Sequence, residues 1–278
     1  MNLSTHRLGR RKWLSVETNT AGIEGDRRNS SLRIAIVSTP RSGNTWLRRL
    51  VADTYALKEQ AVYSPDEVTW DELPPRFILQ IHWHRINPFL SLLEQQQFRV
   101  VVLSRHPLDV LISILHFAPN EHDTAQWLDG EEGGEAKIFG ASPYSPIFLD
   151  YATSPKAAIL LNVSREWARS SRWFRYEDIV RDPAEALCRL GLSIGREAYP
   201  ETIAKAIATN SIEKLRSAAH NQHFWRGQPG HWKHLLPAAE AHKIAQAHRA
   251  VFDEFGYECD PDESLSKDQA DANWAEFR

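Results

Sequence analysis

The segment 38–46 combines residue types that bind phosphate or sulfate. It reads STPRSGNTW, with an apolar run before it and apolar residues at helical spacing after it. A loop between a strand and a helix presents backbone N–H groups and the positive end of the helix dipole to an anion. Arg41 adds a planar guanidinium, which can bind two oxygens of a phosphate or a sulfate. The segment is therefore predicted to be an anion-binding loop.

This loop differs from the G-x-x-x-x-G-K-[ST] loop of nucleoside-triphosphate enzymes. Ser38 replaces the first glycine and Asn44 replaces the lysine, whereas Gly43 and Thr45 are retained. The cation is expected to come from Arg41 without a magnesium clamp, and no metal is predicted. A kinase that uses the loop with magnesium remains an alternative, and so does an ordinary glycine turn.

A second set of polar residues follows another apolar run. The segment 103–109 reads LSRHPLD, with Arg105 at the predicted end of a strand and Ser113 on the helix that follows. Ligands of open α/β sheets bind at the carboxyl ends of the strands, so Arg105 is a second candidate anion-binding residue. Alternatively, Arg105 is a surface ion-pair residue and Ser113 is a helix hydroxyl.

Two further segments carry residues of the same kind. Residues 224–233 read FWRGQPGHWK, and 174–178 read FRYED at the end of a predicted strand. Arg226 and Gly227 can supply a guanidinium and a backbone amide to phosphate oxygens. Alternatively, 224–233 is a glycine and proline turn beside a buried tryptophan.

Together these segments resemble the cytosolic sulfotransferase family. The family's 5′-phosphosulfate loop reads approximately P-K-S-G-T-T-W, and 40–46 matches it with arginine for lysine and asparagine for the first threonine. By resemblance, the loop holds the 5′-phosphosulfate of 3′-phosphoadenosine-5′-phosphosulfate (PAPS), and its tryptophan lies against the adenine. These roles fall to Arg41, Ser42, Gly43, Asn44, Thr45 and Trp46.

The other segments match the family's remaining motifs in order. Its 3′-phosphate motif is R-D-P-x-D with a serine eight positions after the arginine, which implies this role for Arg105 and Ser113. Its R-K-G-x-x-G-D-W-K segment implies the same for Arg226 and Gly227, and its Y-E-D strand end places Tyr176 near the adenine. His106, Trp225 and His231 depart from these motifs. The matches span residues 34–233.

The acceptor must lose a proton, and a histidine suits that role. The sequence holds 12 histidines, and His82 ends a predicted strand. The family's catalytic histidine stands in K-x-H-x-P, but here the lysine position is Gln80 and the proline is absent. His82 is predicted to be the general base, with His84 as the second candidate. A metal-binding His82–His84 pair and a purely structural imidazole are the alternatives.

The elements that position these residues alternate along the chain. Predicted strands cover 32–38, 77–82, 98–104 and 172–176, and predicted helices begin near 45, 107 and 184, with a long one over 237–255. Near-continuous apolar strands suit a parallel sheet covered on both faces. The predicted fold is therefore a three-layer α/β/α sandwich with a central parallel sheet, similar to P-loop nucleotide-binding domains.

The predicted organisation is one sulfotransferase domain over 32–258. Residues 1–31 lack hydrophobic periodicity and are expected to be a disordered lead-in, and 259–278 is expected to be an acidic, flexible tail. Residues 119–146 are rich in glycine, proline and acidic residues, and a long irregular segment of this kind is typical of a functional loop or lid.

Composition limits the partners. With 33 Lys plus Arg against 36 Asp plus Glu, the chain gives no general electrostatic reason to bind nucleic acid. No signal peptide or membrane-inserting run is found, and Cys188 and Cys259 form no disulfide or zinc pattern, so the cytoplasm is expected. The family's dimerisation motif is not identifiable, and no oligomeric state is predicted.

The predicted activity is transfer of a sulfuryl group from PAPS to a hydroxyl or an amine of a small molecule or a glycan. Aromatic residues are expected to line the acceptor pocket, and the candidates are Trp70, Trp83, Phe117, Trp127, Phe139 and Tyr144. A catalytically silent nucleotide-binding protein is the remaining alternative, because of the departures from the family's motifs.

Overall fold

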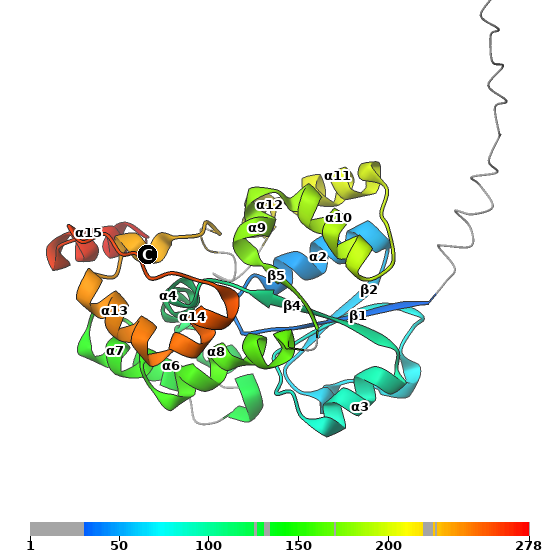
Figure 1. Ribbon diagram of the computed structural model, residues 1–278, viewed down its shortest axis with the longest axis horizontal. Coiled ribbons are helices and arrows are strands. Elements are labelled where there is room, and N and C mark those ends of the chain that lie inside the picture. The colour runs from blue at the N-terminus through cyan, green and yellow to red at the C-terminus, as the bar shows by residue number, and fades with distance from the viewer. Residues whose placement is uncertain are drawn as a thin grey trace, which may run out of the picture. The chain divides into compact units, whose positions relative to one another are not determined.

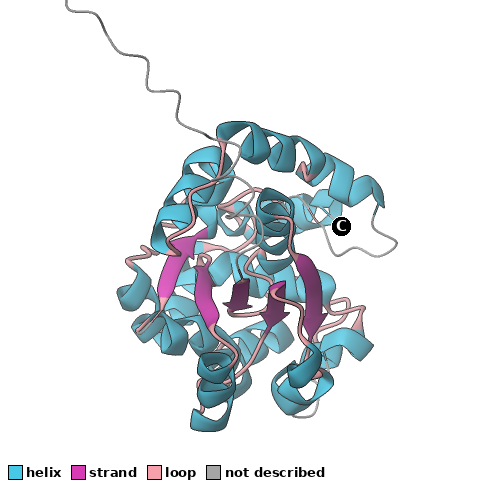
Figure 2. Ribbon diagram, turned by 90° about the vertical axis from the view of Figure 1, so that its right-hand side faces the viewer, coloured by secondary structure: helices cyan, strands magenta, loops and turns pink. Residues whose placement is uncertain are grey.

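Five parallel strands form the central sheet of this computed structural model, in the order β2-β3-β1-β4-β5. The strands are β1 (Leu32–Val37), β2 (Lys58–Val62), β3 (Arg76–Ile81), β4 (Phe98–Ser104) and β5 (Arg172–Arg175). The structure describes residues 31–124, 127–130, 134–169, 171–218, 225 and 227–277. Figure 2 shows the strands side by side with helices on both faces. The predicted parallel α/β sandwich is confirmed.

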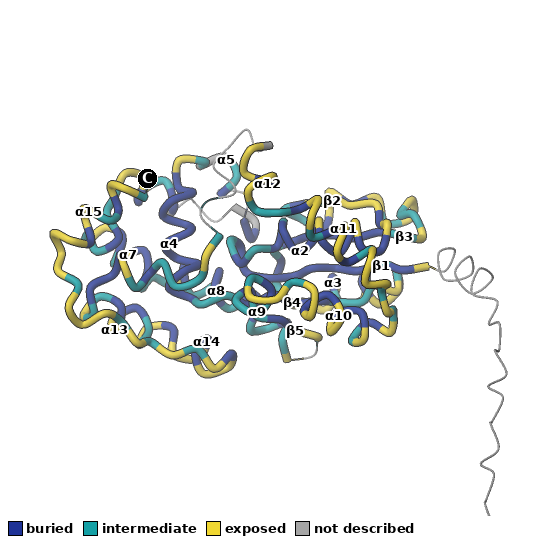
Figure 3. The backbone as a smooth tube through the Cα atoms, turned by 90° about the horizontal axis from the view of Figure 1, so that it is seen from above, coloured by how far each residue is buried: buried dark blue, intermediate teal, exposed yellow. Residues whose placement is uncertain are grey.

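Strand β1 lies at the centre because nearly all its residues are apolar. Residues 34–37 are completely buried, and Figure 3 shows the strand buried along most of its length. Its even-numbered and odd-numbered side chains point to opposite faces of the sheet. Ile34 and Ile36 belong to one hydrophobic cluster, whereas Ala35 and Val37 belong to the other.

Each cluster is covered by its own set of helices, and Figure 1 shows helices both above and below the strands. The first face is covered by α2 (Asn44–Tyr55), α9 (Tyr176–Arg181), α10 (Pro183–Ser193), α11 (Pro200–Thr209) and α12 (Ile212–Ala218). The second is covered by α3 (Asn87–Gln95), α4 (Pro107–Phe117), α7 (Pro146–Ala152), α8 (Pro155–Ala168), α13 (Ala238–Ala247), α14 (Arg249–Phe255) and α15 (Lys267–Phe277). The short helices are η1 (Pro65–Glu67), η2 (Trp70–Glu72), α5 (Glu121–Thr124), η3 (Trp127–Gly130), α6 (Gly134–Lys137) and η4 (His231–His234).

Strand β2 was not predicted. Its sequence, KEQAV, has only one β-branched residue, and Lys58 and Glu59 are exposed. Charged residues are common on edge strands, where they discourage pairing with another chain. The position of β2 at the edge of the sheet therefore explains why its sequence lacks the apolar run of a buried strand.

The helix predicted over 237–255 is two helices. The backbone of His248 leaves the helical conformation, with φ −114° and ψ 24°, and separates α13 from α14. The imidazole is buried, and its Nε2 lies 2.6 Å from the carbonyl oxygen of Ala152. A tertiary contact to α7 accompanies the break, and it leaves no signature in the local sequence.

A packed helix occupies much of the predicted flexible tail. Ala270 and Trp274 of α15 are buried, and Trp274 joins the second hydrophobic cluster. Asn273 Nδ2 also donates to the His234 carbonyl at 2.8 Å. Two buried apolar residues four positions apart, together with this hydrogen bond, dock the acidic helix. The predicted lead-in, apart from Ser31, lies outside the described residues, and its disorder stays a prediction.

Candidate active site

The loop between β1 and α2 requires glycine at one position. Gly43 precedes α2 with φ 95°, and Arg41 also has a positive φ of 64°. A Cβ atom on Gly43 would lie 2.4 Å from the ring of Tyr176, which is far closer than such atoms approach. Glycine therefore serves both the left-handed backbone and the close approach of the aromatic ring.

Buried hydrogen bonds fix this loop to the sheet and to α8. The backbone N–H of Thr39 donates to Ser164 Oγ at 2.8 Å, and Ser38 Oγ accepts from the Leu103 N–H at 2.7 Å. Asn44 Nδ2 donates to the Thr39 carbonyl at 2.9 Å. Asn44, a predicted anion-binding residue, thus uses its amide to close the loop.

A cavity of about 440 Å³ opens where this loop meets the carboxyl ends of the strands. Ten of the 12 predicted site residues line it: Arg41, Gly43, Asn44, Thr45, Trp46, His82, Arg105, Ser113, Tyr176 and Gly227. Ser42 is buried within the loop rather than on the cavity wall, and Arg226 lies outside the described residues. The structure thus brings together residues from five separate segments of the chain.

Two arginines give one end of the cavity a positive charge. Arg41 Nε donates to Ser113 Oγ at 3.1 Å, and its guanidinium lies 4.3 Å from the centre of the Phe117 ring. Arg105 donates to the Arg41 carbonyl at 3.0 Å and lies 4.7 Å from the centre of the Tyr176 ring. Burial, followed by the charge of Arg105, lowers the pKa of Arg41 to about 9. An anion bound here would relieve both effects.

Aromatic side chains form the adjoining wall. The rings of Trp46 and Tyr176 meet edge to face, with centroids 6.1 Å apart. Trp46 Nε1 donates to the Asn210 carbonyl at 2.9 Å, and the Tyr176 hydroxyl donates to the Gly227 carbonyl. Both rings are therefore held in place by their polar ends as well as by packing.

His82 has one ring nitrogen committed to the backbone. Its Nδ1 lies 2.7 Å from the carbonyl oxygen of Ser38, and because a carbonyl only accepts, Nδ1 carries the proton. The lone pair of the neutral ring is therefore on Nε2. Burial is the main cause that lowers the pKa of His82 to about 4; the charge of Arg41 also lowers it, and the Ser38 carbonyl opposes the shift. His84, the second candidate base, is not among the residues that line the cavity.

A scan against protein-family models matches the sulfotransferase domain over residues 32–256. The chain belongs to the sulfotransferase domain family. The mouse sulfotransferase SULT7A1, solved in complex with PAP, is similar in fold, with a TM-score of 0.60 and 16% identity over 82% of this chain and 87% of that one. A retinol dehydratase, solved with retinol and PAP, has a TM-score of 0.54 and 15% identity over 80% of this chain and 82% of that one. A search of curated protein sequences finds no match.

Membership of this family makes the protein a sulfotransferase and replaces the kinase alternative. None of the helices in the described ranges has the length and apolar character to span a bilayer. The described side chains also include no cluster of three or more His, Cys, Asp or Glu with the arrangement of a metal site.

The sulfotransferase departs from the family's motif at His106, which has a structural role here. Its Nδ1 accepts from the Leu108 N–H at 3.3 Å and caps α4, and its ring stacks on Trp232 at 4.9 Å. The neighbouring Asp109 accepts from the N–H groups of Gly230 and Trp232 at 2.7 and 3.2 Å. Asp109 thus ties the first turn of α4 to the turn before η4.

Trp225 stands where the family's motif has a cation, and its ring forms part of the cavity wall. Its ring stacks on His116 at 4.3 Å, and its Nε1 donates to the Phe277 carbonyl at 2.9 Å. Trp225 lines the cavity and links it to the end of α15. Of the six aromatic candidates for the acceptor pocket, Phe117 and Trp127 line the cavity, whereas the other four do not.

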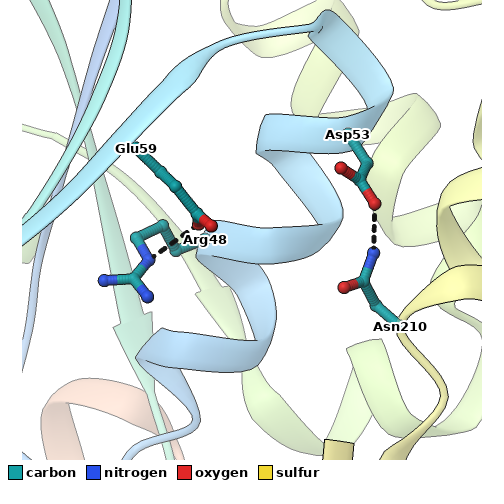
Figure 4. Close-up of polar contacts among 4 residues, drawn as sticks. All are labelled: Arg48, Asp53, Glu59 and Asn210. Atoms are coloured by element: carbon teal, nitrogen blue, oxygen red, sulfur yellow. Dashed lines mark hydrogen bonds and ion pairs between the residues drawn. The ribbon is translucent and has the colours of Figure 1, made fainter. Parts of the chain in front are cut away.

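Several cavity residues were not predicted as site residues. They include Arg48 and Arg49 of α2, Ala61 to Tyr63 at the end of β2, Gln80 of β3 and Asp123 of α5. Arg48 Nε pairs with Glu59 at 3.1 Å on one side of α2, and on the other side Asp53 accepts from Asn210 at 2.7 Å (Figure 4). Most of these residues belong to or adjoin β2 and α5, which were not predicted. Gln80 could have been predicted, because it alternates with His82 along a strand and therefore faces the same side of the sheet.

Proposed function

We propose that this sulfotransferase transfers the sulfuryl group of PAPS to a hydroxyl or an amine of a small-molecule or glycan acceptor, with His82 as the general base. One observation carries the proposal: His82, with Nε2 as its basic nitrogen, lines the same cavity as Arg41. A base and an anion-binding cation are the two groups that sulfuryl transfer requires side by side.

The positive end of the cavity suits PAPS. Arg41 and the loop residues Ser42 to Thr45 would hold the 5′-phosphosulfate, and Arg105, Ser113, Arg226 and Gly227 the 3′-phosphate. Arg105 Nε is buried without a hydrogen-bond partner among the described residues, and an oxygen of a bound anion would satisfy it. PAP in the two similar structures is consistent with this assignment.

The aromatic wall suits the adenine. Trp46 and Tyr176 present two perpendicular rings beside the positive end, and Ile212 and Leu215 of the cavity lining add apolar surface. Aromatic and aliphatic side chains are the usual environment of a planar base. The nucleotide would therefore extend from the loop toward α12.

The reaction is proposed to proceed in one in-line step. The acceptor oxygen bonds to sulfur as its proton passes to His82 Nε2, and the bond between sulfur and the 5′-phosphate oxygen breaks. PAP leaves with the negative charge on its 5′-phosphate, where Arg41 stabilises it. Nδ1 keeps its proton and donates it to the Ser38 carbonyl throughout, so the ring is held in one orientation.

The sulfotransferase domain is proposed to cover residues 32–258, followed by the segment that carries α15. Both cysteines are free thiols, Cys188 exposed and Cys259 half-buried, which suits the reducing cytoplasm.

Calorimetric titration with PAP, without divalent metal, tests the donor site. Binding is expected for the unchanged protein and not for the Arg41→Ala, Arg105→Ala double variant, and ATP should bind far more weakly. Turnover with PAPS then compares His82→Ala with His84→Ala. The first change should lower kcat by about 100-fold or more, whereas the second should not. Absent PAP binding would overturn the proposal, and PAP binding without turnover of any acceptor would favour a silent nucleotide-binding protein.

A further inference from the structure

We propose that the acceptor is a neutral molecule with several hydroxyl groups, of the sugar class, and that Gln80, Arg48 and the Tyr63–Asp123 pair recognise it. The inference rests on the proposed function, because it assigns the part of the cavity that PAPS would not fill. Four observations carry it: the position of Arg48, the unsatisfied amide oxygen of Gln80, the pairing of the charged side chains, and the aromatic ring of Trp127.

Arg48 lies on the opposite side of α2 from the proposed adenine site. Successive helical residues are rotated by about 100°, so Arg48 is turned by about 200° from Trp46. Trp46 reaches Asn210, whereas Arg48 reaches Glu59 on β2. Figure 4 shows Glu59 and Asn210 on opposite sides of the helix. Arg48 therefore belongs to a part of the cavity separate from the adenine wall.

Gln80 places an unsatisfied polar group in this part of the cavity. The side chain is buried, with only 7% of its surface exposed, and its Oε1 has no hydrogen-bond partner among the described residues. Gln80 and His82 alternate along β3, so they face the same side of the sheet. A hydroxyl can donate to the amide oxygen or accept from the amide nitrogen, whereas a carboxylate can only accept. A ligand hydroxyl is the group that satisfies Gln80 in either orientation.

The charged groups in this part of the cavity have partners of their own. Arg48 is paired with Glu59, and Asp123 accepts from the Tyr63 hydroxyl at 3.1 Å. Paired charges of this kind form hydrogen bonds to a neutral polar ligand without favouring an anion. The positive charge of Arg41 and Arg105 at the other end distinguishes the donor site.

An aromatic surface adjoins these polar groups. Trp127 lines the cavity and stacks on Phe117 with centroids 6.1 Å apart, whereas Phe117 itself lies against the Arg41 guanidinium of the donor end. The C–H face of a sugar ring can pack on such a surface while its hydroxyls reach Gln80 and Arg48. A phenol has a single hydroxyl, which would lie at His82 as the nucleophile and leave the buried amide oxygen of Gln80 unsatisfied. Buried polar groups left unpaired discriminate strongly against a substrate.

The test compares acceptors at saturating PAPS. The panel is methyl β-D-galactopyranoside, N-acetylglucosamine, a methyl hexuronide and 2-naphthol. The variants are Gln80→Met and Arg48→Met, with the exposed Gln95→Met as the matched control, and the thermal unfolding midpoint verifies folding. We expect turnover of a neutral sugar, a KM for that sugar raised about 10-fold in Gln80→Met and in Arg48→Met, and no change in Gln95→Met.

Donor binding separates this inference from the proposed function. The Kd for PAP should stay within about twofold in both cavity variants, because neither residue is assigned to the nucleotide. Turnover of 2-naphthol or of the hexuronide without turnover of a neutral sugar would overturn the inference, and so would an unchanged sugar KM in Gln80→Met. A parallel rise in the Kd for PAP would assign these residues to the donor instead. Absent PAP binding by the unchanged protein would overturn the proposed function itself, before any acceptor is added.

Discussion

A single hydrogen bond at His82 decides which nitrogen can act as a base. The Ser38 carbonyl holds the proton on Nδ1, and Ser38 is itself fixed through its hydroxyl to the backbone of β4. The same burial that orients the ring also disfavours its charged form, and the neighbouring Arg41 adds to that effect. His82 is thus neutral at physiological pH, which is the form a base requires.

The pKa of His82 should depend on the donor. Without ligand it should titrate at about 4, and PAP should raise this value because the bound anion opposes the charge of Arg41. NMR titration of the imidazole, assigned by comparison with His82→Asn, measures both values. A pKa near 6.5 without ligand, or one that PAP leaves unchanged, would contradict the assignment of Arg41 and His82 to one site.

The lowered pKa of His82 also predicts how the free energy of unfolding depends on pH. The folded pKa lies below that of an unfolded histidine, so the unfolded chain binds more protons between about pH 6.5 and 4. His82 should therefore stabilise the fold less as the pH falls through this window. His82→Asn removes that part of the pH dependence, since asparagine does not titrate, while its amide can still donate to Ser38. Identical slopes of unfolding free energy against pH in both proteins would contradict this expectation.

At the scale of elements, Asp109 connects helix α4 to the turn before η4. It is buried and accepts from the backbone N–H groups of Gly230 and Trp232. The connection lies close to Gly227, whose carbonyl accepts from Tyr176. The packing of α4 against this turn and the shape of the candidate donor site are therefore both linked to one carboxylate.

Asp109→Ala should destabilise the protein and weaken the donor site. One half-buried and one buried N–H group would lose their acceptor, at a cost of about 2–5 kcal/mol in the free energy of unfolding. The displaced turn should also raise the Kd for PAP, measured by calorimetry below the unfolding midpoint. Asp182→Ala is the control, because the exposed Asp182 caps α10 through Glu185 far from the cavity and should cost about 1 kcal/mol without affecting PAP. Equal effects of both changes on PAP binding would contradict this role of Asp109.

Whether an element could be predicted depends on whether its own residues specify it or contacts with distant residues do. The buried strands β1, β3 and β4 carry apolar runs, and the loop at 38–46 carries its chemistry in adjacent residues, so both could be predicted locally. Strand β2 carries edge charges instead, and the break at His248 depends on a contact with α7. The site residues that β2 and α5 supply were missed for the same reason: their place in the cavity is set by tertiary packing.

At the scale of the whole molecule, helix α15 contacts the wall of the candidate active site. Trp225 forms part of the cavity wall, and helix α15 supports it through the Phe277 carbonyl and the edge of Trp274, whose ring centroid lies 6.1 Å away. Trp274 is itself buried in the core cluster. The segment predicted as a tail therefore stabilises one wall of the candidate donor site.

A shortened chain that ends at Ser266 should bind PAP more weakly. It loses the buried Trp274 and the acceptor for Trp225 Nε1, so we expect a lower unfolding midpoint and a Kd for PAP raised about 10-fold or more. Trp225→Phe is the matched change, since it keeps the stack on His116 and loses only the hydrogen bond. It should raise the Kd about two- to fivefold with little loss of stability. The contrary outcome is a shortened chain that is less stable but binds PAP with unchanged affinity at a temperature where it is folded. In that case α15 would stabilise only the hydrophobic core and not the donor site. If both changes weaken binding in the expected order, the wall formed by Trp225 is part of the donor site and α15 is what positions it.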